Sequence, residues 1–213
     1  MRTSIVLGLV LLFASVSDAR INELRIDQPG SDDSEYFEIF GTPGLNLDGF
    51  HYLVIGDGSG GSGTIETAID LSGNVVPEDG VFLAAESTFG LGGDVDFVTE
   101  INFENSDNVT HLVVGGFSAA LGDDLDTDDD CALDSIPWTT VIDGLALLEE
   151  PNGDSGPPAN TECHYGTDQG FPVIGPDGRF VPGHIYSFPN GSDNYFIGQF
   201  NPVDGDGTPG VSN

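Results

Sequence analysis

The stretch INELRIDQPGSDDSEYFEIFGTPGLNLDGF, residues 21–50, decides the fold of this chain. Within it, residues 21–27 and 35–40 alternate between apolar and polar side chains, and a break rich in Gly, Ser and Asp separates them. A period of two is typical of strands, because successive side chains of a strand point to opposite faces of a sheet. The stretch therefore predicts two neighbouring strands.

The alternation also predicts which side chains point together. In the first strand, Ile21 and Glu23 are expected to face one way and Leu24 the other. In the second strand, Phe37 is expected on an apolar face and Glu38 on an acidic rim. One side of each strand should therefore be buried, and the other should meet solvent.

The rest of the chain continues the pattern of short apolar runs between turns. It has 31 glycines and 13 prolines, and no window shows the apolar stripe of a helix. Further strands are expected at residues 50–55, 64–71, 81–85, 110–114, 139–148, 185–188 and 195–200. Residues 115–137 and 149–183 are richer in Asp, Gly, Pro and Asn, and they predict long acidic loop insertions. The expected fold class is all-β, in one domain.

The N-terminal residues 1–19 have the composition of a signal peptide. Arg2 precedes an almost wholly apolar run over residues 5–14, and small residues lead to Ala19, after which cleavage is expected. The apolar run is shorter than the roughly 20 residues that a membrane-spanning helix needs. Residues 20–213 are therefore expected to form a single secreted domain without a membrane span, located outside the cell, at its surface or in a periplasm.

The charge of the chain excludes polyanionic partners. It has 36 acidic residues against four arginines, and its formal net charge is -32. A protein without basic patches cannot neutralise phosphates, so nucleic acids and anionic lipid surfaces should repel it. Three explanations of the charge are open: residence in high salt, binding of divalent cations, or solubility.

The two cysteines, Cys131 and Cys163, are expected to form a disulfide, because the chain is predicted to be exported. Closing the loop between them should stabilise the fold by roughly 3 to 4 kcal/mol, since it restricts the unfolded chain. A catalytic thiol is the alternative, and His164 is the one basic partner that the neighbouring sequence offers.

The sharpest local motif is the acidic run DDLDTDDDCALD at residues 123–134. If it curls into a loop, alternate carboxylates can surround one Ca²⁺ ion at roughly 2.3 to 2.6 Å. We expect calcium to be bound by four aspartates of this run, namely Asp124, Asp126, Asp128 and Asp130. The alternative is a solvated acidic turn without metal. A second acidic turn, at residues 204–207, is expected to be a plain turn.

This acidic run does not fit an EF-hand. Counted from Asp124, the sixth position is Asp129, where an EF-hand has Gly. The twelfth position is Ser135, where an EF-hand has a bidentate Glu. The hypothesis is therefore an irregular calcium loop, held closed by the cysteine near its end.

Signals of catalysis are weak. The histidines do not fall at metal-ligand spacings; they are His51, His111, His164 and His184. The chain has no Gly-x-Ser-x-Gly motif and no lysine. A carboxylate pair for glycoside hydrolysis carries no information in a chain with 36 acidic residues. We therefore expect a protein that is not an enzyme.

Four segments together resemble a lamin-tail domain, an immunoglobulin-like β-sandwich that occurs in nuclear lamins and in secreted bacterial proteins. The segments are INE at residues 21–23, EYFEI at 35–39, LNLDGF at 45–50 and TPGVSN at 208–213. The resemblance implies an immunoglobulin-like β-sandwich with long acidic loop insertions, and its structural motifs carry over no catalytic residue. It also implies a secreted, non-enzymatic module for binding, adhesion or assembly at a cell surface, with a polymer or a protein as partner.

Two other functions are open at this point. One is an extracellular hydrolase, or an accessory protein of a hydrolase, whose acids and histidines are brought together only by folding. The other is an acidic protein that binds a mineral or a polymer. This last function predicts acidic side chains that cluster on one face, whereas adaptation to high salt predicts an even spread.

Overall fold

The computed structural model describes residues 19–59, 61–149, 163–178, 180–205 and 207–213. The expected signal peptide lies outside these ranges except for Ala19, and the acidic turn 204–207 includes residue 206, which also lies outside them. The helices of the described ranges are α1 (Gly166–Gln169) and the 3-10 helix η1 (Pro202–Asp204). Neither has the length and apolar character needed to cross a membrane.

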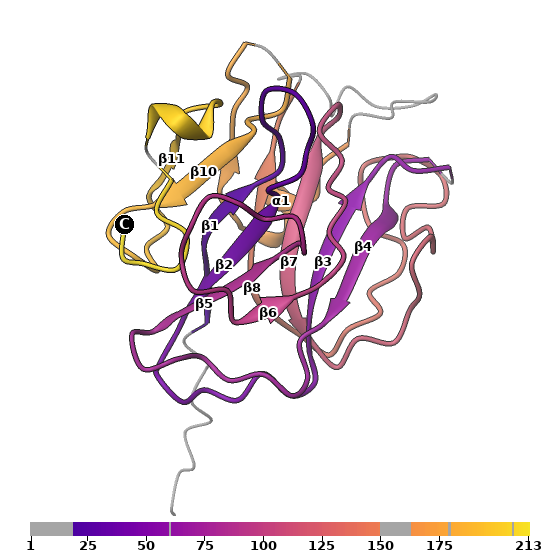
Figure 1. Ribbon diagram of the computed structural model, residues 1–213. Coiled ribbons are helices and arrows are strands. Elements are labelled where there is room, and N and C mark those ends of the chain that lie inside the picture. The colour runs from indigo at the N-terminus through magenta and orange to yellow at the C-terminus, as the bar shows by residue number, and fades with distance from the viewer. Residues whose placement is uncertain (1–18, 60, 150–162, 179, 206) are drawn as a thin grey trace, which may run out of the picture.

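Two sheets make up the domain (Figure 1). In the first sheet the strands lie in the order β11 (Tyr195–Ile197), β10 (His184–Ser187), β1 (Arg20–Arg25), β2 (Tyr36–Phe40), β5 (Val81–Ala85) and β6 (Phe97–Val98). In the second they lie in the order β4 (Thr64–Asp70), β3 (Phe50–Gly56), β7 (Val109–Gly115), β8 (Thr140–Leu147) and β9 (Val173–Ile174). The expected all-β fold is confirmed.

The strands expected from the sequence are all present, and each end lies within three residues of its expected position. Two further strands, β6 and β9, are not predicted by the sequence. Each has two residues and pairs in parallel with a longer strand, β6 with β5 and β9 with β8. Two residues are too few to show a period, so the polarity pattern does not reveal them.

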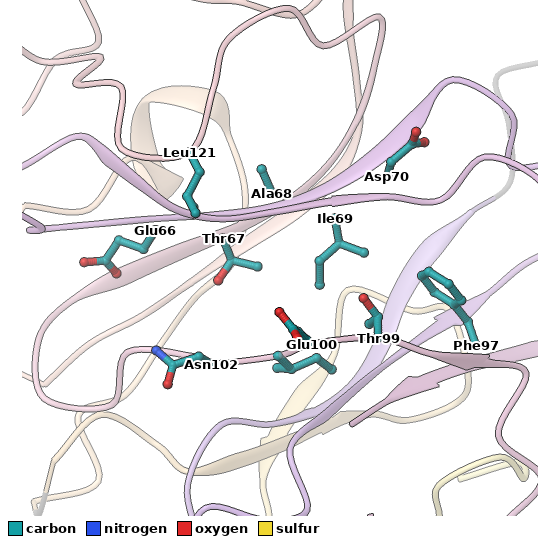
Figure 2. A pocket seen from close by; sticks show the side chains of 11 residues that line it. Glu66, Thr67, Ala68, Ile69, Asp70, Phe97, Thr99, Glu100, Asn102 and Leu121 are labelled. Carbon is teal, nitrogen blue, oxygen red and sulfur yellow. The ribbon is translucent and has the colours of Figure 1, made fainter. Parts of the chain in front are cut away.

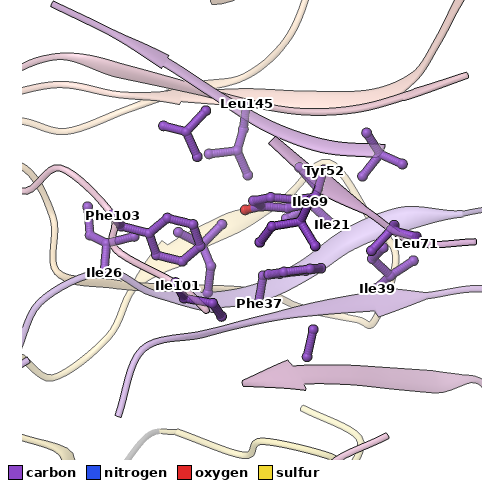
Figure 3. Packing of buried hydrophobic residues seen from close by; sticks show 14 of the residues in the cluster. Ile21, Ile26, Phe37, Ile39, Tyr52, Ile69, Leu71, Ile101, Phe103 and Leu145 are labelled. Carbon is purple, nitrogen blue, oxygen red and sulfur yellow. The ribbon is translucent and has the colours of Figure 1, made fainter. Parts of the chain in front are cut away.

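The core lies between the two sheets and is filled by apolar side chains from both (Figure 3). Phe37 of β2 stacks on Tyr52 of β3, with ring centroids 3.8 Å apart. Ile21, Ile69 and Leu145 are buried in the same cluster. Full burial of one such side chain contributes roughly 1.5 to 3 kcal/mol, so this cluster is the main force that holds the sheets together.

A β-bulge in β1 changes the faces expected for its first residues. The register of β1 on β2 shifts between Ile21 and Glu23, whose partners are Ile39 and Glu38. Ile21 consequently enters the core, whereas Glu23 points to the outer face of the sheet, where Thr208 binds it. The prediction that Ile21 and Glu23 share a face is wrong, because a bulge inserts one residue into the alternation.

The C-terminal segment 208–213 covers the part of the outer face of the first sheet that holds Glu23 and Glu38. The backbone N–H of Thr208 donates to Glu23 Oε1 at 3.0 Å, and that of Gly210 donates to Glu38 Oε2 at 2.9 Å. Glu23 and Glu38 are consequently fully buried. The prediction that Glu38 lies on a solvent-exposed acidic rim is wrong, because groups of the protein, and not water, donate hydrogen bonds to its carboxylate.

The outer face of the second sheet is covered by the connections before and after β8. They bury a second apolar cluster, which includes Leu125, Trp138 and Tyr165. Leu53 of β3 and Leu112 of β7 form the sheet side of this cluster. The described parts of the acidic insertions are therefore layers packed on the sheet, and apolar contacts fix their position.

Candidate metal centres

The disulfide expected between Cys131 and Cys163 is present, with Cα atoms 5.2 Å apart. Cys163 is buried in the cluster that covers the second sheet. The bond joins residues 123–134, here called the acidic loop, to the segment that leads into α1. It holds the C-terminal part of the acidic loop against the domain.

The acidic loop curls, as a cation site requires. Asp129 and Cys131 have φ values of 53° and 67°, in the left-handed region that residues other than glycine rarely adopt. The curl brings carboxylate oxygens of Asp126, Asp128 and Asp130 within 4.8 Å of one another. Three of the four expected ligands therefore meet.

Asp124, the fourth expected ligand, does not join this group. Its Oδ1 accepts a hydrogen bond from the backbone N–H of Asp126 at 2.9 Å. Its backbone also forms a bridge with Thr64 at the start of β4. Asp124 therefore stabilises the turn and docks the acidic loop on the second sheet.

Asp126 is the buried anchor of the acidic loop. Its Oδ2 accepts hydrogen bonds from the Cys131 N–H at 2.9 Å and from the Tyr165 hydroxyl at 2.8 Å. Its Oδ1 accepts one from the Asp130 N–H at 3.2 Å. Gly63 lies so close that a Cβ there would be 2.6 Å from the Asp126 Cβ. Much of the acceptor capacity of Asp126 is thus used within the protein, and a cation would have to share its oxygens.

Asp128 and Asp130 are exposed, and they complete the group of three. The negative charge of Asp130 is the main reason why the pKa of Asp128 is raised. Carboxylate oxygens suit hard cations such as Ca²⁺, and a cation between these side chains would offset their repulsion. Water or a partner would supply the remaining ligands.

A second acidic cluster consists of Asp57, Glu66 and Asp107, whose carboxylate oxygens lie within 4.8 Å of one another. Asp57 follows β3, Glu66 lies in β4, and Asp107 precedes β7. Because β3 pairs with both β4 and β7, these positions come to one end of the second sheet. The motif spacing does not predict this cluster; the pairing of the three strands is the signal that could have revealed it.

Burial makes negative charge unfavourable in this second cluster. Asp107 is 3% exposed, and its Oδ2 accepts a hydrogen bond from the Asp57 N–H at 3.1 Å. Burial raises the pKa of Asp107 to about 9, and the neighbouring Asp57 and Glu66 add to the rise. Burial likewise raises the pKa of Glu66 to about 7, with Glu104 as the next cause. The cluster therefore favours either a proton or a bound cation.

A groove of about 410 Å³ lies beside the second cluster, between β4 and residues 97–102 (Figure 2). Glu66 lies at one end of the groove, and Asp70 and Phe97 lie at the other (Figure 2). Glu66 thus belongs both to the second cluster and to the lining of the groove.

Three of the four histidines are buried, His111, His164 and His184, and His111 and His184 are fully inaccessible to solvent. His111 Nδ1 lies 2.9 Å from the Tyr52 hydroxyl, and burial lowers the pKa of His111 to about 3. His184 Nε2 lies 3.0 Å from Glu23 Oε1, and both side chains are fully buried. Neither His111 nor His184 can exchange a proton directly with a substrate at the surface.

No protein-family model matches this chain, and neither the curated proteins nor the solved structures compared with it include a significant match.

Proposed function

We propose that the mature chain is a secreted, non-enzymatic module for binding, adhesion or assembly at a cell surface, built on an immunoglobulin-like β-sandwich similar to a lamin-tail domain. In this proposal the acidic loop holds Ca²⁺ through Asp126, Asp128 and Asp130. The loop presents the bound ion to a polymer or protein partner. The disulfide supports the proposed export, because such bonds persist in oxidising compartments.

Three of the four segments that resemble a lamin-tail domain meet in space, which is consistent with the proposed likeness. The Asn22 side chain donates a hydrogen bond to Glu38, which links the first two segments. Thr208 and Gly210 of the last segment donate to Glu23 and Glu38. Residues remote in the sequence thus form one buried polar network, which gives these segments a joint structural role.

The observation that carries the functional proposal is the disulfide-held acidic loop. Its three carboxylates lie within 4.8 Å of one another, and one of them, Asp126, is fixed by hydrogen bonds. A preorganised group of oxygens loses little conformational entropy when it binds a cation. The exposure of Asp128 and Asp130 would leave coordination positions for water or for an oxygen atom of a partner.

A second candidate, an acidic protein that binds a mineral or a polymer, is favoured by the position of both acidic groups around one turn. The turn between β3 and β4 contacts both of them. A Cβ on Gly58 would lie 3.4 Å from Glu66, and a Cβ on Gly61 would lie 2.4 Å from Asp129. Acidic side chains thus gather at this end of the second sheet. A hydrolase has less support, because three of the four histidines are buried, namely His111, His164 and His184.

Hydrogen exchange tests whether the acidic loop binds calcium. Millimolar Ca²⁺ should slow exchange of the loop amides by about tenfold or more relative to a chelator, because a bound ion opposes local opening. The double variant Asp128→Asn/Asp130→Asn should show no such difference, and the amides of β2, in the other sheet, serve as the internal control. Equal exchange with and without Ca²⁺ at one ionic strength would end the proposal of a calcium-loaded loop.

A further inference from the structure

We propose that Asp57, Glu66 and Asp107 bind a second Ca²⁺ ion, which ties the turn after β3 and the strand β4 to the segment before β7. This site shares no residue with the acidic loop. Its ligands come from three separate parts of the chain, so the ion would act as a clasp at one end of the second sheet.

The spacing of the carboxylates fits a single ion. Their ligand oxygens lie within 4.8 Å of one another. With a Ca–O distance of roughly 2.4 Å, two oxygens on the same Ca²⁺ ion can be at most about 4.8 Å apart. The three carboxylates therefore stay within the largest separation that a shared ion allows.

Two buried oxygens of this cluster lack a partner. Asp107 Oδ1 and Glu66 Oε2 are inaccessible to solvent, and neither has a hydrogen bond within the described part of the chain. Asp107 as a whole is 3% exposed. Buried carboxylate oxygens are almost always hydrogen-bonded or bound to metal, so these two atoms need either a proton or a cation.

The described arginines do not supply the counter-charge. Arg20 forms an ion pair with Asp143 at 2.9 Å. The guanidinium of Arg25 donates to the backbone carbonyl of Phe200 at 3.0 Å. Both are therefore engaged elsewhere, and a cation from solution is the natural partner of the second cluster.

The backbone leaves room for the carboxylate of Glu66. A Cβ on Gly56, the last residue of β3, would lie 2.2 Å from Glu66 Oε2. The carboxylate thus occupies the space of the side chain that glycine lacks. Any larger residue at position 56 would displace it from the cluster.

Calorimetric titration with CaCl₂ tests this site in the purified protein after removal of metal with a chelator. Wild-type protein should bind Ca²⁺ at the second cluster, and Asp107→Asn should weaken this binding by about tenfold or more. Asp128→Asn alters the acidic loop alone and is the matched control, so it should leave this binding event unchanged.

Melting temperatures with and without Ca²⁺ distinguish a metal ligand at position 107 from a residue that has only a structural role. In chelator, Asp107→Asn should melt no lower than wild type, because asparagine has nearly the same size and keeps an acceptor for the Asp57 N–H. In millimolar Ca²⁺ the variant should melt at a lower temperature than wild type, because the ion stabilises the variant less. If Asp107→Asn does not fold, Glu66→Gln replaces it with the same expectations.

Two results would overturn the proposed second site. The first is that wild type, Asp107→Asn and Glu66→Gln have the same Ca²⁺ affinity and the same Ca²⁺-dependent rise in melting temperature. The other is calcium binding that is lost in Asp128→Asn and fully retained in Asp107→Asn, which would assign all binding to the acidic loop.

Discussion

The substitution Glu23→Ala should lower the free energy of unfolding by about 3 kcal/mol or more, because each buried hydrogen-bond donor left without its acceptor costs about 1 to 3 kcal/mol. Glu23 Oε1 lies 3.0 Å from His184 Nε2, and both side chains are fully buried. The Tyr36 hydroxyl and the backbone and side chain of Thr208 also donate to Glu23. Alanine would leave these donors without an acceptor in a place that water does not reach. Urea unfolding of the oxidised protein measures the loss.

The pH dependence of this loss is a further check. Burial raises the pKa of Glu23, but hydrogen bonds from His184 and Tyr36 outweigh burial, so the pKa lies below its ordinary value of 4.5. Stability from such an acid is fully present above the unfolded pKa and is lost as pH falls through the folded pKa. The difference between wild type and Glu23→Ala should therefore be largest above about pH 5 and shrink in acid.

The matched control for this position is Glu23→Gln, which keeps the size of the side chain and one acceptor oxygen. It should be less destabilising than Glu23→Ala, because part of the network keeps its partner. A glutamine variant as unstable as the alanine variant, or a difference that does not change in acid, would contradict the role assigned to the carboxylate.

Replacing Cys131 and Cys163 with alanine should lower the free energy of unfolding by roughly 3 to 4 kcal/mol. The bond spans 32 residues of sequence, and its loss gives the unfolded chain more freedom. Guanidinium unfolding of the double variant measures this effect, and reduced wild-type protein is the control for the change of side chain. An unchanged unfolding midpoint in the double variant would show that the disulfide does not stabilise the domain.

The strands could be predicted from the sequence because local polarity decides them. Val81 to Ala85 and the run from Thr110 to Val114 are apolar segments between turns, and both form strands at the expected places. The length of β11 is overestimated, because the residues after Ile197 leave the sheet. Local polarity thus predicts which segments form strands, and it is less informative about where each strand ends.

The environment of the acidic residues could not be predicted from their strands. Glu23 and Glu38 have the alternation of solvent-facing residues, but Thr208 and Gly210 cover them from the other end of the chain. The bulge after Ile21 could not be predicted either, because it depends on how β1 pairs with β2. Both features depend on long-range contacts, which no local period records.

The two candidate metal centres also differ in how far the local sequence predicts them. The acidic run could be predicted as a candidate cation site because its carboxylates are neighbours in the sequence, and three of its four expected ligands meet. Asp124 is the exception, because it binds the N–H of Asp126. The cluster of Asp57, Glu66 and Asp107 depends on the pairing of three strands, so its residues carry no common motif.

Bound calcium, in the proposal made above, stabilises this fold at its acidic clusters. The most direct measurement is the melting temperature of the wild-type protein in millimolar Ca²⁺ and in chelator, at one ionic strength. We predict an increase on the order of 5 °C in Ca²⁺, because an ion that binds only the folded state shifts the unfolding equilibrium. Coincident melting curves in the two buffers would contradict the claim.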